Sequence, residues 1–291
     1  MTDFARPSNV VVVYHPAVRG AEDVAAALSK QATDAGVRSS VAPLAEGDGA
    51  FIGGIEGLDL IVCVGGDGTV LHTSLHAAER GTPIFGVRMG RLGFLTESVE
   101  EDAHDDFARV LAGEARLDRR SMVQAQLGDE TFHALNDVVL GRARLGRTIA
   151  VHAHIDGVML AEYRADALVI STATGSTGYS LSVGGPILHP TSSEMILVPV
   201  APHLTRANAL VLPGTTSLRL SVQRGFEAVL SVDGIHHRAV ESGAVVQVSR
   251  STRGVDFVRL GGVDDFYHHL AQRLGWLRLD HVIDDPQPTD R

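Results

Sequence analysis

The chain has 291 residues, of which 44% are hydrophobic and 21% charged, and its formal net charge is −10. This length allows one large domain or two ordinary ones, and the hydrophobic content permits a sizeable core. The negative charge argues against a protein that grips nucleic acid or anionic membrane without specificity. An anionic small molecule stays possible if arginines lie where it binds.

The amino-terminal stretch and the cysteine content favour a cytoplasmic protein with no membrane partner. The start, MTDFARPSNVVVVYHP, lacks the basic region and long apolar core of a signal peptide, and no apolar run approaches a membrane span. Cys63 is the single cysteine, so an intramolecular disulfide cannot form. We expect Cys63 to be an ordinary buried residue.

The first 115 or so residues alternate strand and helix patterns. Continuous apolar strands separated by helices predict a parallel sheet that helices cover on both faces. The strands are expected at 9–16, 58–64 and 82–87, and the helices at 21–36, 69–81 and 99–113. In such sheets ligands bind beyond the carboxyl ends of the strands, where GGDGT (65–69) and RMGRLGF (88–94) lie.

After about residue 116 short alternating segments replace the helical pattern. TIAVHAHIDGVMLAEYRA (148–165) predicts a hairpin around Asp156-Gly157, and five more short strands follow it. The sequence therefore predicts an α/β domain over 1–118, a β-rich domain over 119–262, and a closing helix with a tail over 263–291. The closing helix is amphipathic and is expected to pack on one of the two domains.

Two glycine-rich stretches are candidates for the chemistry. A glycine turn at the start of a helix offers backbone N–H groups to a phosphate, yet GGDGT places the Asp67 carboxylate in that cradle. The alternative is a tight turn in which Asp67 serves only as the N-cap of the helix. The second stretch, RADALVISTATGSTGYSLSVGGPILHP (164–190), combines hydroxyls with glycines that let a ligand approach the backbone closely.

Together with LNDVVL (135–140), these stretches resemble the NAD kinase family, whose members phosphorylate the adenosine ribose 2′-hydroxyl of NAD. The motifs run in the family's order: GGDGT, G-x-x-x-G-x-L-G-F, Asn-acidic, the long glycine motif, APH and a late Asp-Gly. The resemblance implies a Rossmann-like amino-terminal domain, a β-rich NAD-binding domain, and a final helix that returns to the first domain. This architecture agrees with the pattern of strands and helices.

The resemblance also implies roles for individual residues. Asp67 corresponds to the catalytic base that acts on the 2′-hydroxyl. The phosphate donor, ATP or polyphosphate, is implied at Gly65, Gly66, Gly68 and Thr69. NAD is implied at Asp67, Gly68, Phe94, Asn136, Asp137, Arg147, Arg164, Asp166, Thr174, Thr177, Gly178, Tyr179, Ser182 and Ala201.

Magnesium is expected to accompany the donor, and no side chain is assigned as a metal ligand. Relatives are commonly dimers or tetramers, which implies a homo-oligomer.

The sequence departs from the family's pattern at three positions. Asp137 stands where many relatives have Glu, Arg88 where Asn or His is frequent, and Ile235 where several have Gln. We therefore transfer no contact to Ile235, but none of these departures removes a group that the chemistry demands.

Other features admit plainer interpretations. Arg88 and Arg91 are either solvated loop charges or the positive charge that an acidic protein needs at a phosphate site. His152 and His154, at i and i+2, have no third ligand nearby and are expected on an ordinary β surface. Two alternative functions are a lipid kinase of the diacylglycerol or sphingosine kinase type, which shares GGDGT, and a non-catalytic NAD(P)-sensing module.

Overall fold

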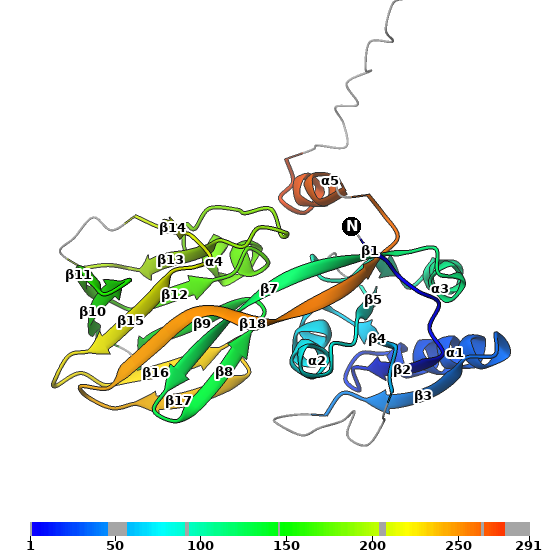
Figure 1. The fold of residues 1–291 in the computed structure, drawn as a ribbon, viewed down its shortest axis with the longest axis horizontal. Helices are drawn as coiled ribbons and strands as arrows, with labels where there is room; N and C mark the ends of the chain where they lie inside the picture. Colours follow the sequence, from blue (N-terminus) through cyan, green and yellow to red (C-terminus); the bar gives the residue numbers. More distant parts are fainter. Residues whose placement is uncertain are drawn as a thin grey trace, which may run out of the picture. The chain divides into compact units, whose positions relative to one another are not determined.

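The computed structural model describes residues 2–45, 57–90, 93–144, 146–203, 208–262 and 265–276. Residues 1–260 form one compact unit, and the chain from residue 261 onward forms a second, smaller one. The larger unit contains an α/β region, blue to cyan in Figure 1, and a β-rich region, mostly green to yellow. All contacts described below lie within this larger unit.

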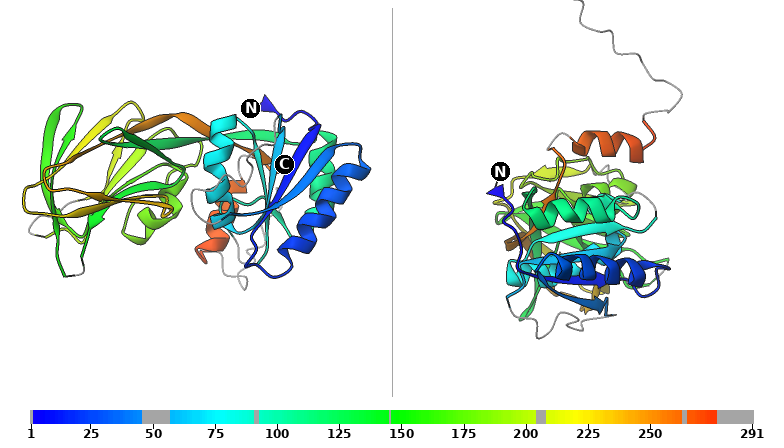
Figure 2. Two further views of the ribbon diagram at one scale, coloured as in Figure 1. Left: turned by 90° about the horizontal axis from the view of Figure 1, so that it is seen from below. Right: turned by 90° about the vertical axis from the view of Figure 1, so that its right-hand side faces the viewer.

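The α/β region is a parallel sheet with helices on both faces, as predicted. Strands β3, β2, β4 and β5 lie side by side in that order and are all parallel. Val10 and Val12 of β2 pack with α1 and α3, whereas Val11 and Val13 pack with α2. Figure 2 shows α2 on one side of the sheet and α1 and α3 on the other. The elements are β1 (Thr2–Asp3), β2 (Asn9–Tyr14), α1 (Ala21–Asp34), β3 (Arg38–Pro43), β4 (Leu60–Gly65), α2 (Asp67–Arg80), β5 (Ile84–Arg88), β6 (Ser98–Val99) and α3 (Ala103–Ala112).

The β-rich region consists of antiparallel strands in two facing layers. A six-stranded sheet has the order β14-β13-β12-β9-β16-β17, and the facing layer includes β10, β11, β15 and β18. The strands of the β-rich region, in chain order, are β7 (Arg116–Leu127), β8 (Glu130–Ala134), β9 (Asp137–Arg142), β10 (Ile149–Ile155), β11 (Val158–Ala165), β12 (Ala167–Ser171), β13 (Met195–Val200), β14 (Leu210–Leu212), β15 (Ser217–Val222), β16 (Ala228–Val232), β17 (His236–Val240) and β18 (Val245–Arg259).

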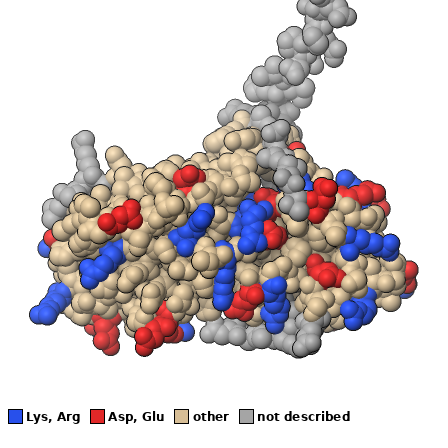
Figure 3. Space-filling model, viewed as in Figure 1, with Lys and Arg blue, Asp and Glu red and all other residues tan. Residues whose placement is uncertain are grey.

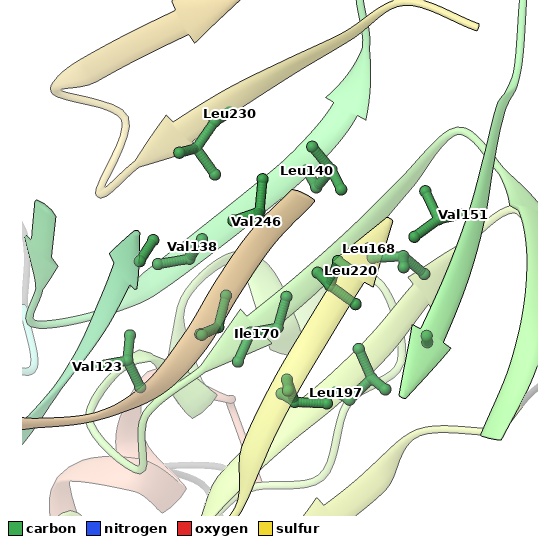
Figure 4. Packing of buried hydrophobic residues seen from close by; sticks show 14 of the residues in the cluster. Val123, Val138, Leu140, Val151, Leu168, Ile170, Leu197, Leu220, Leu230 and Val246 are labelled. Carbon is green, nitrogen blue, oxygen red and sulfur yellow. The ribbon is translucent and has the colours of Figure 1, made fainter. Parts of the chain in front are cut away.

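Aliphatic side chains from both layers fill the space between them. Leu140 and Ile170 come from the six-stranded sheet, whereas Leu220 and Val246 come from the facing layer, and all four belong to one buried cluster (Figure 4). The predicted hairpin is confirmed, because Ile155 of β10 pairs with Val158 of β11. Asp156 and Gly157 both have positive φ, at 49° and 84°, as a two-residue hairpin turn requires.

Two long strands connect the regions into one sheet of 12 strands. The start of β18 pairs with β15, its end pairs with β5 at Phe257 and Ile84, and β7 runs antiparallel along its length. Both strands are visible in Figure 1 as ribbons that cross the middle of the unit. The division near residue 118 falls inside β7, and the predicted domain bounds stay a prediction.

Two further helical segments complete the described chain. A 3-10 turn, η1 (Gly175–Thr177), and the short helix α4 (Tyr179–Ser182) follow β12 within the long glycine motif. The predicted closing helix is present as α5 (Asp265–Arg273) in the second unit, and its return to the first domain stays a prediction. Among the described residues, no helix is both long and apolar enough to cross a membrane.

Candidate active site

The GGDGT turn connects β4 to α2 through closely packed small residues. A side chain on Gly65 is excluded, because a Cβ there would lie 2.2 Å from the Thr69 hydroxyl oxygen. Thr69 is buried, and its hydroxyl accepts the Gly66 N–H at 3.4 Å. Gly66 is the N-cap of α2 and Asp67 is the first residue of the helix, so the alternative in which Asp67 acts as the N-cap is wrong.

The Asp67 carboxylate is held by backbone N–H groups at the end of the G-x-x-x-G-x-L-G-F motif. The Phe94 N–H donates to Asp67 Oδ2 at 2.8 Å, and the Leu95 N–H donates to Oδ1 at 3.1 Å. The two motifs meet because β4 and β5 are neighbouring parallel strands, with Gly65 opposite Arg88 at their carboxyl ends. Phe94 and the residue after it therefore contact the catalytic candidate through their backbone, a role that sequence reasoning did not assign.

A buried carboxylate organises the Asn136-Asp137 segment. Asp233 accepts the backbone N–H groups of Leu135, Asn136 and Asp137 at 2.7, 2.8 and 2.9 Å. Burial raises the pKa of Asp233 to about 7, although its three hydrogen bonds favour the charged form. Asp233 also has a positive φ of 52°, which Asp tolerates better than most residues. The late Asp-Gly motif was the only sequence signal for this arrangement.

The long glycine motif packs against the same segment. Thr172 donates its N–H to Asn136 O at 2.9 Å and its hydroxyl to Leu135 O at 2.6 Å. Its hydroxyl oxygen in turn accepts the Gly175 N–H at 3.0 Å. A Cβ on Gly175 would lie 2.1 Å from Asn136 O, so the two loops can approach this closely only because residue 175 is glycine.

These loops, with Val139 of β9 and Ser231 of β16, line an open cavity of about 420 Å³. That volume lies within the range of small-molecule sites. Burial raises the pKa of the Asp137 carboxyl to about 6. The structure thus brings Asn136, Asp137 and Tyr179 together at one cavity. Its full lining is Asn136, Asp137, Val139, Tyr179, Ser231, Asp233 and Gly234.

The helix that begins at GGDGT packs against the segment that leads into this cavity. Val70 of α2 and Leu135, the residue before Asn136 of the cavity lining, belong to one buried cluster. This packing links the helix that follows the glycine turn to the cavity of the β-rich region.

The remaining residues implied by the resemblance lie in different settings. Thr174 is buried with a hydroxyl that has no hydrogen-bond partner within the described chain, and the Thr177 hydroxyl donates to Thr174 O at 3.2 Å. Gly178 is the N-cap of α4, and the exposed Ser182 ends that helix. Ala201 follows β13 with a positive φ of 46°.

Two of the charged candidates, Arg164 and Asp166, contact other charged side chains, and Arg147 lines a different cavity. Arg164 is exposed with its Nε 3.3 Å from Glu162, and Asp166 accepts Arg142 Nη1 at 2.7 Å. Arg147 lines a separate cavity of about 490 Å³ formed by Ala143, Arg144, Gly146, Arg147, Thr148, Gly225, Phe226 and Glu227.

Two further sequence features are the arginines at 88 and 91 and the histidine at 152. Arg88 is half-buried at the end of β5, and Arg91 lies outside the described residues. His152 contacts Gln223 at 2.9 Å and lies 3.7 Å from Glu162, and the described residues contain no group of three metal-ligand side chains.

Comparison with known proteins gives a family for both regions. Residues 11–115 match the ATP-NAD kinase N-terminal domain, and residues 135–260 match the ATP-NAD kinase C-terminal domain. An NAD kinase of Dehalococcoides mccartyi (strain CBDB1) is 36% identical over 269 residues, which cover 90% of this chain and 94% of the relative.

Two solved structures share the fold. Yeast NADH kinase complexed with NADH aligns with a TM-score of 0.80 and 23% identity, covering 94% of this chain and 90% of that chain. An NAD kinase from Archaeoglobus fulgidus in complex with ATP aligns with a TM-score of 0.76 and 24% identity, covering 93% and 100%. The predicted fold class, an α/β amino-terminal domain and a mainly β carboxy-terminal domain with a closing helix, is confirmed.

The chain belongs to the ATP-NAD kinase family. The predicted enzyme class, a phosphotransferase with an alcohol group as acceptor, and the predicted function, NAD kinase, are confirmed by this membership. The match to both domains favours this function over the lipid-kinase and sensing-module alternatives.

Proposed function

We propose that Asp67 is the base that takes the proton from the NAD 2′-hydroxyl while ATP or polyphosphate donates the phosphoryl group. A ribose hydroxyl is a poor nucleophile, and phosphoryl transfer needs positioning and an acceptor for the proton. The observation that carries the proposal is the pair of hydrogen bonds that the Phe94 and Leu95 backbone N–H groups donate to the Asp67 carboxylate, beside the glycine turn. Because a carboxylate oxygen has two lone pairs, a bond to one amide is compatible with receiving a hydroxyl proton.

The donor phosphates are proposed to bind at Gly65, Gly66, Gly68 and Thr69. Gly68 is exposed in the first turn of α2, where backbone N–H groups and the helix dipole favour anions. Magnesium bound to the donor would neutralise phosphate charge and so reduce repulsion by Asp67. The donor site fits such a metal, because Mg²⁺ usually keeps several waters and binds through substrate phosphates. No side chain is assigned as its ligand, and Asp67 is proposed only as the base.

NAD is proposed to occupy the cavity beside Asn136, Asp137 and Tyr179. The Asn136 side-chain amide can pair with a ribose hydroxyl or an adenine edge, and the Tyr179 ring, 44% exposed, offers a surface for stacking. Further proposed contacts are Asp67, Gly68, Phe94, Arg164, Asp166, Thr174, Thr177, Gly178, Ser182, Ala201 and Arg147. Arg147 has the least support, because it lines the separate cavity.

Two further proposals concern the oligomeric state of the protein and its location in the cell. We propose that the enzyme works as a homo-oligomer, dimer or tetramer, as the family resemblance implies. A cytoplasmic location is proposed from the single, buried cysteine, which is typical of a reducing compartment.

The direct test is formation of NADP from NAD, ATP and magnesium, read through an NADP-specific dehydrogenase. Polyphosphate in place of ATP identifies the donor, and NADH in place of NAD identifies the acceptor. Diacylglycerol or sphingosine in place of NAD tests the lipid-kinase alternative. Phosphorylated lipid without NADP would contradict the proposal.

A further inference from the structure

The segment Gly93–Glu97, which we call the strap, contacts Asp67 at one end. Its Phe94 and Leu95 N–H groups donate to different oxygens of the Asp67 carboxylate, at 2.8 and 3.1 Å. A single hydrogen bond would leave the carboxylate free to turn about its bond to Cβ. Two bonds from adjacent amides fix the plane of the carboxylate as well as its position.

Gly93 permits this approach. A Cβ at residue 93 would lie 2.0 Å from Asp67 Oδ1 and 2.6 Å from Asp67 Cγ. The φ of Gly93 is not in the left-handed region, so the backbone conformation itself does not require glycine. Glycine is needed here because of the carboxylate and not because of the chain's own conformation.

The middle of the strap is seated on β5. Leu95 is 3% exposed, and the Glu97 N–H donates to Gly86 O at 2.9 Å. A Cβ on Gly86 would lie 3.0 Å from the Cα of Thr96, so a second glycine allows the strap to lie against the strand. These contacts leave the strap little room to shift.

The far end of the strap is anchored in a buried ionic cluster. Glu97 Oε2 accepts Arg259 Nη1 at 3.0 Å, and Glu97 Oε1 accepts the Leu260 N–H at 2.7 Å. Arg259 is buried, lies 3.7 Å from Asp118 Oδ2, and has its guanidinium 5.1 Å from the centre of the Phe257 ring. The end of β18 thereby holds the strap in place.

We propose that the strap is a positioning device for the catalytic carboxylate: Gly93 admits Asp67 to the two amides, and Arg259 holds the strap through Glu97. Gly93, Glu97 and Arg259 are positioning residues that act through Asp67. The inference rests on the proposed role of Asp67 as the base.

The first test is Gly93→Ala, with Gly141→Ala as the matched control. A Cβ on Gly141 meets only ordinary contacts at 3.6 to 4.0 Å, and its φ is also outside the left-handed region. Gly93→Ala is expected to lower kcat about 10–10²-fold, a fraction of the effect of a general base. The KM for NAD should change less than threefold, and Gly141→Ala should leave both constants near wild type.

A cycle with Asp67→Asn separates positioning from general damage. If Gly93 acts through the carboxylate, Gly93→Ala should lower kcat in the wild-type background and leave the residual kcat of Asp67→Asn unchanged. Equal reductions in both backgrounds, or full activity of Gly93→Ala, would overturn the inference. Failure of the proposed function looks different, because Asp67→Asn itself would then retain its turnover.

Glu97→Gln provides a second variant should Gly93→Ala fail to fold. The amide keeps the size of the side chain but removes the charge that pairs with Arg259. We expect kcat to fall about 3–10-fold, roughly the 1 kcal/mol typical of one hydrogen bond, with the KM for NAD unchanged and no further loss in the Asp67→Asn background. Wild-type kcat in Glu97→Gln would remove Arg259 and Glu97 from the device.

Discussion

Asp137 is a buried carboxylate whose pKa is raised from 3.8 to about 6 by its surroundings. Because the folded state holds the proton more tightly, the free energy of unfolding should fall as pH rises from about 4 to about 6. Above that window both states are ionised, and the full cost of about 3 kcal/mol is present. Removing the charge should therefore stabilise the protein most at high pH.

The variant Asp137→Asn tests this directly. Its stability gain over wild type, measured by urea unfolding, should be larger at about pH 8 than at about pH 5 by roughly 1.4 kcal/mol. Asp129→Asn, in the exposed turn between β7 and β8, is the control and should show no such difference. A gain that does not depend on pH would mean that burial does not disfavour the Asp137 charge.

Asn136 and Tyr179 are proposed to hold the acceptor without handling a proton. Asn136→Ala and Tyr179→Ala each remove one hydrogen-bonding or stacking group, which is worth about 1–3 kcal/mol. Steady-state kinetics should show a raised KM for NAD and an almost unchanged KM for the donor. An unchanged KM for NAD in both variants would exclude these residues from the acceptor site.

Residue roles could be predicted only where a local motif carried them. Asp67 stands inside GGDGT, and its position at the start of α2 follows from the glycines around it. Asp233 escaped prediction because its three amide partners lie 96 to 98 residues earlier in the chain. The hydrogen bonds from Phe94 and Leu95 to Asp67 were missed for a different reason. Their donors are backbone N–H groups, which leave no signature in side-chain identity.

At the scale of elements, periodicity predicted the α/β region well. The apolar runs became β2, β4 and β5, and the expected helix at 69–81 is observed as Asp67–Arg80. The lengths and partners of β7 and β18 were not predictable, because alternation shows which face a residue takes but not which strand lies beside it. The register shift of β18 between Arg250 and Gly254 adds to this difficulty.

The packing of the long glycine motif on the Asn136 loop gives a prediction for an element. Gly175→Ala would place a Cβ 2.1 Å from Asn136 O, a backbone atom that cannot rotate away. We expect the loop to move, with a raised KM for NAD and a loss of stability of about 1–3 kcal/mol. Thermal unfolding and kinetics would be compared with Gly141→Ala, and wild-type values for Gly175→Ala would show that the two loops are not in contact.

The whole molecule carries a net charge of −10, yet both proposed substrates are anions. Figure 3 shows basic side chains standing among acidic ones over the visible face. Because the net charge is negative, long-range electrostatic attraction does not draw these anions to the protein. Local N–H groups, arginines and the donor's metal ion must therefore bind them. For this reason the net charge argued against nucleic acid and anionic membrane as partners but could not identify a small anionic ligand, which binds through local groups.

Dependence on a divalent metal follows from this electrostatic balance. Chelation by EDTA should abolish NADP formation, and an excess of Mg²⁺ should restore it, because the donor phosphates otherwise face Asp67 unshielded. The unfolding temperature should be unaffected by EDTA, since the metal is proposed to arrive with the donor. Full turnover in EDTA would contradict the proposed part played by magnesium.

The central claim is that Asp67 takes the proton from the NAD 2′-hydroxyl, and turnover of Asp67→Asn tests it most directly. Asparagine keeps the shape of the side chain and an oxygen acceptor but cannot serve as the base. With donor, NAD and magnesium saturating, kcat should fall by about 10²–10⁴-fold, while calorimetry shows NAD still bound and the unfolding temperature near wild type. If Asp67→Asn keeps most of the wild-type kcat under these conditions, the general-base role is wrong.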